Sequence, residues 1–279
     1  MKHVLGFSGG IDSQAVARWL LNRYPAEDCI FLNSDAGRNE HDLTKEFVTQ
    51  YNAEIHEVIH VEAHISDMWV GADEPTKHGY NPSDVLTFDT MAEIKGRFPA
   101  RRSQFCTKIL KVDPIARWVK ANLRHGDYEA YTGVRRDESE NRRNTPFREW
   151  NEIYDTYVNN VIADWSKAMC FEFIKSHGEP INPLYLMGFS RIGCMPCVNW
   201  GKDDILTMEA RSPESIDKIR RWEQRVGRTF FGPMVPGMAI NWIDDVIAWA
   251  KTDRGGRQSN MFRSLNERPN CESKYGLCE

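Results

Sequence analysis

Hydrophobic and polar positions change period repeatedly along the first 160 residues. Apolar side chains cluster within residues 1–7, and then recur at Ala15, Val16, Trp19 and Leu20, which is the spacing of one helix face. The same patterns predict strands at 29–33, 54–61 and 128–132 and helices at 42–52, 87–95 and 113–124. Alternating strands and helices predict an α/β fold with a doubly wound, mainly parallel sheet and helices on both faces.

The second half of the chain is predicted to be mostly helical. A helix begins near Asp164 and ends before Gly178, and a long charged helix is expected over 203–226. Residues 64–84 show little periodicity and are expected to cover the site, while the polar tail from Lys251 winds back over the body. We therefore divide the chain into a core, residues 1–160, and a smaller helical, Cys-rich region, residues 161–279, that completes the site.

The turn between the first strand and the first helix reads Gly6-Phe7-Ser8-Gly9-Gly10-Ile11-Asp12-Ser13. Adjacent glycines let the backbone approach a ligand, and the unpaired N–H groups of a helix's first turn attract an anion. Ser8 and Ser13 add hydroxyl donors, and Asp12 is placed to orient the loop or to hold a metal. No Lys follows the second glycine and no third glycine is present, so neither the Walker nor the Rossmann pattern applies. The turn predicts a phosphate-binding loop.

Other polar residues follow predicted strands, where parallel sheets bind their ligands. Asp35 comes directly after the second strand, so it is a candidate for contacting a nucleotide, although a turn or helix-capping role fits equally well. Gly133 follows the strand at 128–132 and opens a segment rich in arginine. We expect both to lie near the phosphate-binding loop.

Composition is that of a water-soluble protein, with 41% hydrophobic and 27% charged residues. No run of about 20 apolar residues and no basic-then-apolar leader is present, which predicts a cytoplasmic protein without a membrane partner. Seven cysteines in such a chain favour metal or redox chemistry over a disulfide framework.

Two cysteines lie on a tight turn, Gly193-Cys194-Met195-Pro196-Cys197, where both thiols can reach one metal. The remaining candidate ligands are Cys106, Cys271 and Cys278. Zinc and an iron–sulfur cluster both accept four thiolates, so spacing does not choose between them. Cys29 and Cys170 fall in apolar segments and are better explained as small buried residues.

Charge is unevenly distributed around a net value of −4. Between Lys95 and Arg148 there are fourteen Lys or Arg against six Asp or Glu. This segment predicts a basic surface for the phosphates of a nucleotide or a nucleic acid, unless carboxylates from elsewhere pack against it.

The string Ser8-Gly9-Gly10-Ile11-Asp12-Ser13 resembles the pyrophosphate loop of the adenine nucleotide alpha-hydrolase superfamily, which splits ATP between its α and β phosphates. Three further segments look like motifs of the phosphoadenosine phosphosulfate (PAPS) reductase family within it. They are Phe105 to Pro114, Gly133 to Ser139 with Arg142, and Asn182 to Cys197.

The chain also departs from that family. Thr107 stands where the cluster-bearing reductases have the second Cys of a Cys-Cys pair, so a fourth ligand must come from the tail, from Cys271 or Cys278. The tail lacks the Glu-Cys-Gly-Leu-His type of string through which sulfonucleotide reductases act. The cysteine layout is similar to that of the DNA phosphorothioation ATP pyrophosphatases of the same branch.

The resemblance implies an ATP pyrophosphatase that binds ATP and Mg²⁺, attaches AMP to an acceptor oxygen and releases pyrophosphate, so that sulfur can replace the adenylate. Ser8, Gly9, Gly10 and Ser13 would hold the pyrophosphate, with Asp12 supporting the loop or the metal. Lys111, Arg135 and Arg142 would neutralise the transferring phosphate. Asp35 and Gly133 complete the expected nucleotide site.

The expected partners are a nucleic-acid acceptor, either DNA or transfer RNA, and a cysteine desulfurase as sulfur donor; a homodimer is compatible with the sequence. The expected cofactor beside ATP and Mg²⁺ is a 4Fe-4S cluster on Cys106, Cys194, Cys197 and a tail cysteine, with zinc as the alternative. Two other functions stay open. One is a sulfonucleotide reductase that uses Cys271 or Cys278 as nucleophile, and the other is a non-catalytic nucleotide-sensing subunit.

Overall fold

The computed structural model describes the chain except residues 69–78, 101–102, 234–236, 238–240 and 253–279. Its centre is a six-stranded sheet in the order β3-β2-β1-β4-β6-β5. The strands are β1 (Lys2–Gly6), β2 (Cys29–Ser34), β3 (Val58–Val61), β4 (Tyr128–Tyr131), β5 (Arg148–Asn151) and β6 (Thr156–Asn159). Neighbouring strands pair in parallel except β5, which is antiparallel to β6. The predicted doubly wound, mainly parallel α/β sheet is confirmed.

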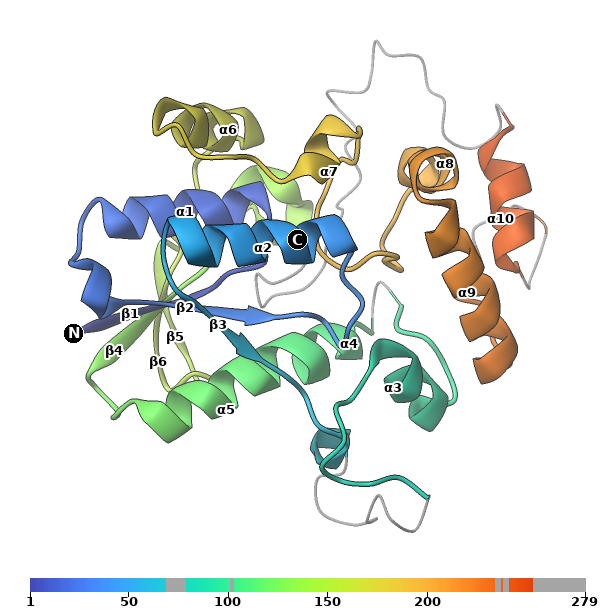
Figure 1. Ribbon diagram of the computed structural model, residues 1–279, viewed down its shortest axis with the longest axis horizontal. Helices are drawn as coiled ribbons and strands as arrows, with labels where there is room; N and C mark the ends of the chain where they lie inside the picture. Colours follow the sequence, from blue (N-terminus) through green and yellow to red (C-terminus); the bar gives the residue numbers. More distant parts are fainter. Residues whose placement is uncertain (69–78, 101–102, 234–236, 238–240, 253–279) are drawn as a thin grey trace.

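Helices cover both faces of this sheet (Figure 1). Successive side chains of a strand point to opposite faces, so Leu5 packs with α1 (Ile11–Leu21), α2 (Asp42–Glu54) and α6 (Lys167–Ser176), while Val4 packs with α5 (Asp113–Asn122). The helix predicted near residue 164 is α6, for which Ser166 is the N-cap. Although α6 belongs to the second half of the chain, it packs on α1, and the boundary at residue 160 stays a prediction.

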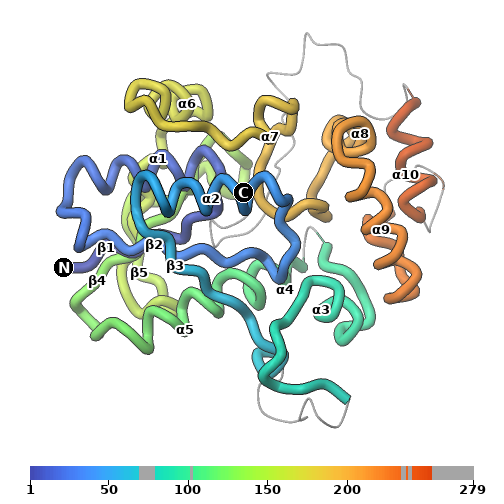
Figure 2. The backbone as a smooth tube through the Cα atoms, viewed as in Figure 1, coloured from blue at the N-terminus to red at the C-terminus, as the bar shows by residue number. Residues whose placement is uncertain are grey.

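A separate hydrophobic cluster lies beyond the ends of the strands. It joins α3 (Phe88–Lys95) to α8 (Lys202–Arg211), α9 (Pro213–Val226) and α10 (Ile243–Ala250), which lie at the same end of the molecule (Figure 2). Within the cluster, the rings of Phe88, Trp222 and Phe230 are in mutual contact. The buried Glu223 carboxylate accepts the N–H groups of Phe230 and Ile243 at 2.8 and 3.0 Å, which ties the end of α9 to the start of α10. Met195 of the cysteine-containing turn belongs to this cluster, and Cys197 packs against it.

Several predicted boundaries differ from the structure. The single long helix expected over 203–226 is wrong, because α8 ends at Arg211 and α9 starts afresh with Pro213 in its first turn. The strand expected over 54–61 begins only at Val58, since α2 runs on to Glu54. The β5–β6 hairpin, α10 and the four-residue helix α7 (Pro183–Leu186) were not predicted.

The segment expected to cover the site lies partly outside the described residues, as does most of the polar tail. Within the described part of the chain, no helix is long and apolar enough to cross a bilayer.

Candidate functional site

The connections that follow β1 and β4 meet at one end of the sheet. These strands are parallel neighbours, and the chain leaves β1 toward β2 on one side while β4 lies on the other, which creates the crevice where such sheets bind ligands. A Cβ placed on Gly133, in the β4 connection, would lie 3.1 Å from the backbone of Asp12 and Ser13. The two connections therefore touch, and glycine allows the contact.

Hydroxyl groups organise the loop before α1. The Ser8 N–H donates to Ser13 Oγ at 3.2 Å and the Gly10 N–H to Ser8 Oγ at 3.3 Å, while Ser13 Oγ donates to the Gly10 carbonyl at 2.9 Å. Gly9 has φ +74°, a conformation that disfavours other residues, and a Cβ there would lie 3.0 Å from Val48. The loop is thus a compact turn in which both serine hydroxyls bond to the loop's own backbone.

A segment distant in sequence braces this loop. Asn182 Nδ2 donates to the Gly9 carbonyl and to Thr44 Oγ1, both at 3.2 Å, and the Ile11 N–H donates to the Tyr185 hydroxyl at 2.9 Å. Asn182 is the N-cap of α7 (Pro183–Leu186) and Tyr185 lies within this helix, which packs on α2. Neither Asn182 nor Tyr185 was predicted as a site residue, although both lie in the motif from Asn182 to Cys197, which is the signal that could have indicated them.

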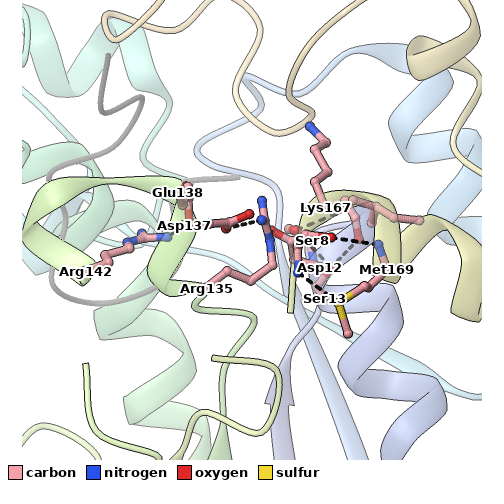
Figure 3. Close-up of polar contacts among 12 residues, drawn as sticks. Ser8, Asp12, Ser13, Arg135, Asp137, Glu138, Arg142, Lys167 and Met169 are labelled. Atoms are coloured by element: carbon pink, nitrogen blue, oxygen red, sulfur yellow. Dashed lines mark hydrogen bonds and ion pairs between the residues drawn. The ribbon is translucent and has the colours of Figure 1, made fainter. Parts of the chain in front are cut away.

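Asp12 and Arg135 form a buried ion pair at the start of α1. Arg135 Nε donates to Asp12 Oδ2 at 2.7 Å, and neither side chain is more than 5% exposed. The guanidinium also pairs with the half-exposed Asp137, so it lies between the two carboxylates (Figure 3). Asp12 Oδ1 is buried without a hydrogen-bond partner among the described residues. The pair places a guanidinium, whose charge is balanced by these carboxylates, directly beside the Ser8–Ser13 loop.

Two other predicted residues take more local partners. Arg142 pairs with Glu138 within the β4 connection, and both side chains are buried (Figure 3). Asp35 accepts the Arg38 N–H at 2.9 Å in a turn that contains the left-handed residues Ala36 and Arg38. The alternative of a turn residue is therefore observed for Asp35, while the ligand-binding roles of Asp35 and Arg142 stay predictions.

The second part of the candidate site is a small cavity that is lined by three cysteine thiols. Cys106 lies in α4 (Phe105–Thr107), and Cys194 and Cys197 lie on the predicted turn. Burial raises the pKa of Cys106 to about 12 and also raises that of Cys194. In the described ranges no three His, Cys, Asp or Glu side chains are close enough to hold a metal ion, and Cys271 and Cys278 lie outside them. Cys29 and Cys170 are buried, as predicted.

Lys111 lines the thiol cavity. It lies on the π-helical turn Lys108–Val112 between α4 and α5, and is buried. Burial lowers the pKa of Lys111, but the adjacent Cys194 and Glu40 raise it by more. Lys111 therefore lies beside the three cysteines. Its role toward a transferring phosphate stays a prediction.

Hydrogen bonds through Asn39, which belongs to none of the sequence motifs, hold the cysteine turn in place. The Met195 N–H donates to the Asn39 carbonyl at 2.7 Å, Asn39 Nδ2 donates to the Pro196 carbonyl at 2.9 Å, and Lys218 of α9 donates to Asn39 Oδ1 at 2.9 Å. The adjacent Glu40 is buried, and burial raises its pKa to about 7. Such contacts join residues far apart in sequence, so periodicity could not reveal them.

Glu40 makes stability depend on pH. Its pKa rises from 4.5 in the unfolded chain to about 7, so the folded state keeps a proton that the unfolded state loses, and stability falls as pH rises between those values. The free energy of unfolding of the wild type relative to Glu40→Gln should decline across pH 5 to 7, by at most about 1.4 kcal/mol per pH unit, and flatten above pH 8. Urea unfolding at four pH values measures this, and a pH-independent difference would contradict it.

Carboxylates neutralise much of the basic segment. Seven of its cations form ion pairs: Lys108–Asp113, Arg117–Asp67, Arg135–Asp12, Arg136–Asp164, Arg142–Glu138, Arg143–Glu140 and Arg148–Glu129. Of these partners, Asp67, Asp12 and Asp164 come from outside the segment, so the alternative that carboxylates from elsewhere pack against the basic residues is observed at Arg117, Arg135 and Arg136. This reduces the charge available to a nucleic acid.

Comparisons with known proteins place the chain in one family. The family model described as phosphoadenosine phosphosulfate reductase domain matches residues 2–200. An uncharacterized 37.8 kDa protein of Escherichia phage 186 is 29% identical over 99% of this chain and 96% of its own length.

Named enzymes match shorter stretches. The adenosine 5'-phosphosulfate reductase of Allochromatium vinosum is 36% identical over 36% of both chains, and that of Neisseria meningitidis serogroup B is 36% identical over 48% of this chain and 50% of its own. The matches thus span about a third to a half of these reductases. The crystal structure of PAPS reductase from Candida auris covers 71% of this chain and 83% of its own, with 17% identity and a TM-score of 0.49.

Proposed function

The chain belongs to the phosphoadenosine phosphosulfate reductase domain family, and from this premise we propose that it is an enzyme that binds ATP at the loop before α1 and releases pyrophosphate. The observation that carries the proposal is the combination of the Ser8–Ser13 loop with the buried Asp12–Arg135 pair. Backbone N–H groups, serine hydroxyls and a guanidinium converge there, and such groups stabilise the charge of a leaving phosphate.

The proposed reaction takes place at the α-phosphorus. An oxygen of the acceptor forms a bond to this atom while the bond to the bridging oxygen of the β-phosphate breaks, so AMP stays on the acceptor and pyrophosphate leaves. Ser8, Gly10 and Ser13 hold the leaving group, and Arg135 neutralises charge that develops beside it. A sulfur nucleophile then displaces AMP from the acceptor.

Asp12 supports the loop in this scheme. Its Oδ2 is held by Arg135, while the buried Oδ1 lacks a partner among the described residues and would be the atom available to Mg²⁺. When bound, Mg²⁺ would add positive charge to the phosphates.

For the cysteine cavity we propose a 4Fe-4S cluster on Cys106, Cys194, Cys197 and one of the tail cysteines. The support for this proposal is that Cys106, Cys194 and Cys197 line one cavity beside the buried Lys111, which would offset the charge of a thiolate-bound group, although the three thiols are not close enough to hold a single metal ion. Protein purified without oxygen should contain about four irons and absorb near 400 nm, and Cys106→Ser should lose both while Cys170→Ser keeps them. If the protein contained one zinc per chain and did not absorb near 400 nm, the cluster proposal would be wrong and the cysteines would form a zinc site.

Pyrophosphate release tests the main proposal. Wild-type protein is mixed with ATP, Mg²⁺, a cysteine desulfurase with cysteine, and either DNA or transfer RNA, since nucleic acid is the acceptor that we propose. Release should depend on one acceptor and disappear in Asp12→Asn. Equal release by this variant would refute the role of the loop. ATP binding without release in any mixture would favour a nucleotide-sensing subunit.

A sulfonucleotide reductase is the second candidate, favoured by the names of the relatives. A thiolate of Cys271 or Cys278 would attack the sulfate sulfur of adenosine 5'-phosphosulfate, the sulfur–oxygen bond to AMP would break, and thioredoxin would release sulfite from the S-sulfonated cysteine. Thioredoxin-dependent sulfite production that is lost in one of the two Cys→Ser variants, without ATP cleavage, would establish this activity instead.

A further inference from the structure

The Tyr185 hydroxyl occupies a backbone N–H of the phosphate-binding loop. The Ile11 N–H, the first of α1, donates to it at 2.9 Å. The N–H groups of a helix's first turn have no partner within the helix and are the groups that bind anions. A side chain from residue 185 therefore stands where a ligand oxygen would be expected.

The other loop amides show the same kind of partner. The Ser8 N–H donates to Ser13 Oγ and the Gly10 N–H donates to Ser8 Oγ. A hydroxyl differs from a carbonyl in such a position because it can also donate a hydrogen bond. When an anion arrives and accepts the N–H, the hydroxyl can turn its own O–H toward the same anion. Tyr185 thus has the chemical property that the two motif serines have.

The phenol is held in position from several sides. Its ring meets the Phe171 ring edge-on at 5.0 Å between centroids, and the Lys167 ammonium lies 5.0 Å from the ring centroid. Asn182 caps α7 and simultaneously binds the Gly9 carbonyl, so the short helix and the loop are joined at two points. The hydroxyl can therefore shift by one hydrogen bond without the ring leaving the site.

We propose that Tyr185 is an anion-binding residue of the loop. When a phosphate or sulfate group enters, the Ile11 N–H transfers from the phenol to the anion, and the Tyr185 hydroxyl donates to the same anion. This inference rests on the proposed function, because it needs the loop to bind an anion, and it adds a ligand contact from outside the glycine motif.

Tyr185→Phe tests the inference, because it keeps the ring and removes only the hydroxyl. Binding of inorganic pyrophosphate with Mg²⁺ is measured by calorimetry on the full-length chain. We expect about tenfold weaker binding, the size of one hydrogen bond to a charged group. Tyr157→Phe, at an exposed position on β6, should bind like the wild type. Circular dichroism confirms that each variant is folded.

The opposite result distinguishes a structural role. If Tyr185 only satisfies the Ile11 N–H in the free protein, its removal takes away a competitor, and pyrophosphate binding stays equal or tightens, which would overturn the inference. A second measurement on the wild type follows the Ile11 amide resonance, which should shift on pyrophosphate binding and would overturn the inference by staying in place. No pyrophosphate or ATP binding by the wild type would instead remove the proposed function together with it.

Discussion

Replacing Arg135 by Met will abolish pyrophosphate release and lower the free energy of unfolding by about 3 to 5 kcal/mol. The substitution leaves Asp12, which is fully buried, as a carboxylate without its cation. Removing one partner of a buried pair costs more than the pair itself contributes, because the remaining charge stays away from water. Activity is measured as pyrophosphate release and stability by urea unfolding.

Two controls separate the catalytic and structural parts of this effect. Arg136→Met removes the neighbouring cation, whose partner Asp164 is exposed, and should cost at most about 1 kcal/mol. The double variant Asp12→Asn, Arg135→Met removes both charges, so it should regain part of the stability while staying inactive. If the double variant were less stable than Arg135→Met, or if Arg135→Met kept its activity, the buried pair would not have the role given to it here.

Replacing Gly133 by Ala will reduce pyrophosphate release at least 100-fold while the protein stays folded. The new Cβ would lie 3.1 Å from backbone atoms of Asp12 and Ser13, which cannot rotate away as a side chain would, so the start of α1 must shift. Overpacking of this kind costs about 1 to 3 kcal/mol. A displacement of about 1 Å at a catalytic loop is sufficient for the loss of rate.

The matched control is Gly232→Ala. A Cβ at Gly232 meets no atom of the described residues within 4 Å, so this variant should behave like the wild type in both assays. Full activity of Gly133→Ala would show that the two connections can separate without consequence, and the close contact would then have no functional meaning.

The fold and the loop could be predicted because local pattern specifies them. Residues 1–21 contain a strand, a glycine turn and a helix in direct succession, and each has its own periodicity. The break between α8 and α9 was available in the sequence as well, since Pro213 cannot continue a helix interior. The break was missed because the residues around Pro213 are mostly polar or charged, and the spacing of the apolar residues does not change there.

The partners of the site residues could not be predicted in the same way. Lys111 lines the thiol cavity from the π-helical turn Lys108–Val112, a position that periodicity did not indicate, and its role toward a phosphate stays a prediction. The β5–β6 hairpin escaped prediction because Arg148–Asn151 is a short edge strand with mainly exposed side chains. The surroundings of Glu40 and Lys218 consist of residues that folding brings near them. A single sequence carries no signal of such proximity.

The contacts of Asn182 and Tyr185 with Gly9 and Ile11 also constrain the order of events during synthesis. The glycine turn leaves the ribosome first, but its braces follow more than 170 residues later. A nascent chain that contains only β1 and α1 therefore lacks the contacts from Asn182 and Tyr185 to this turn. Under the proposed function, nucleotide binding at a complete loop has to follow the emergence of α7 and its packing on α2.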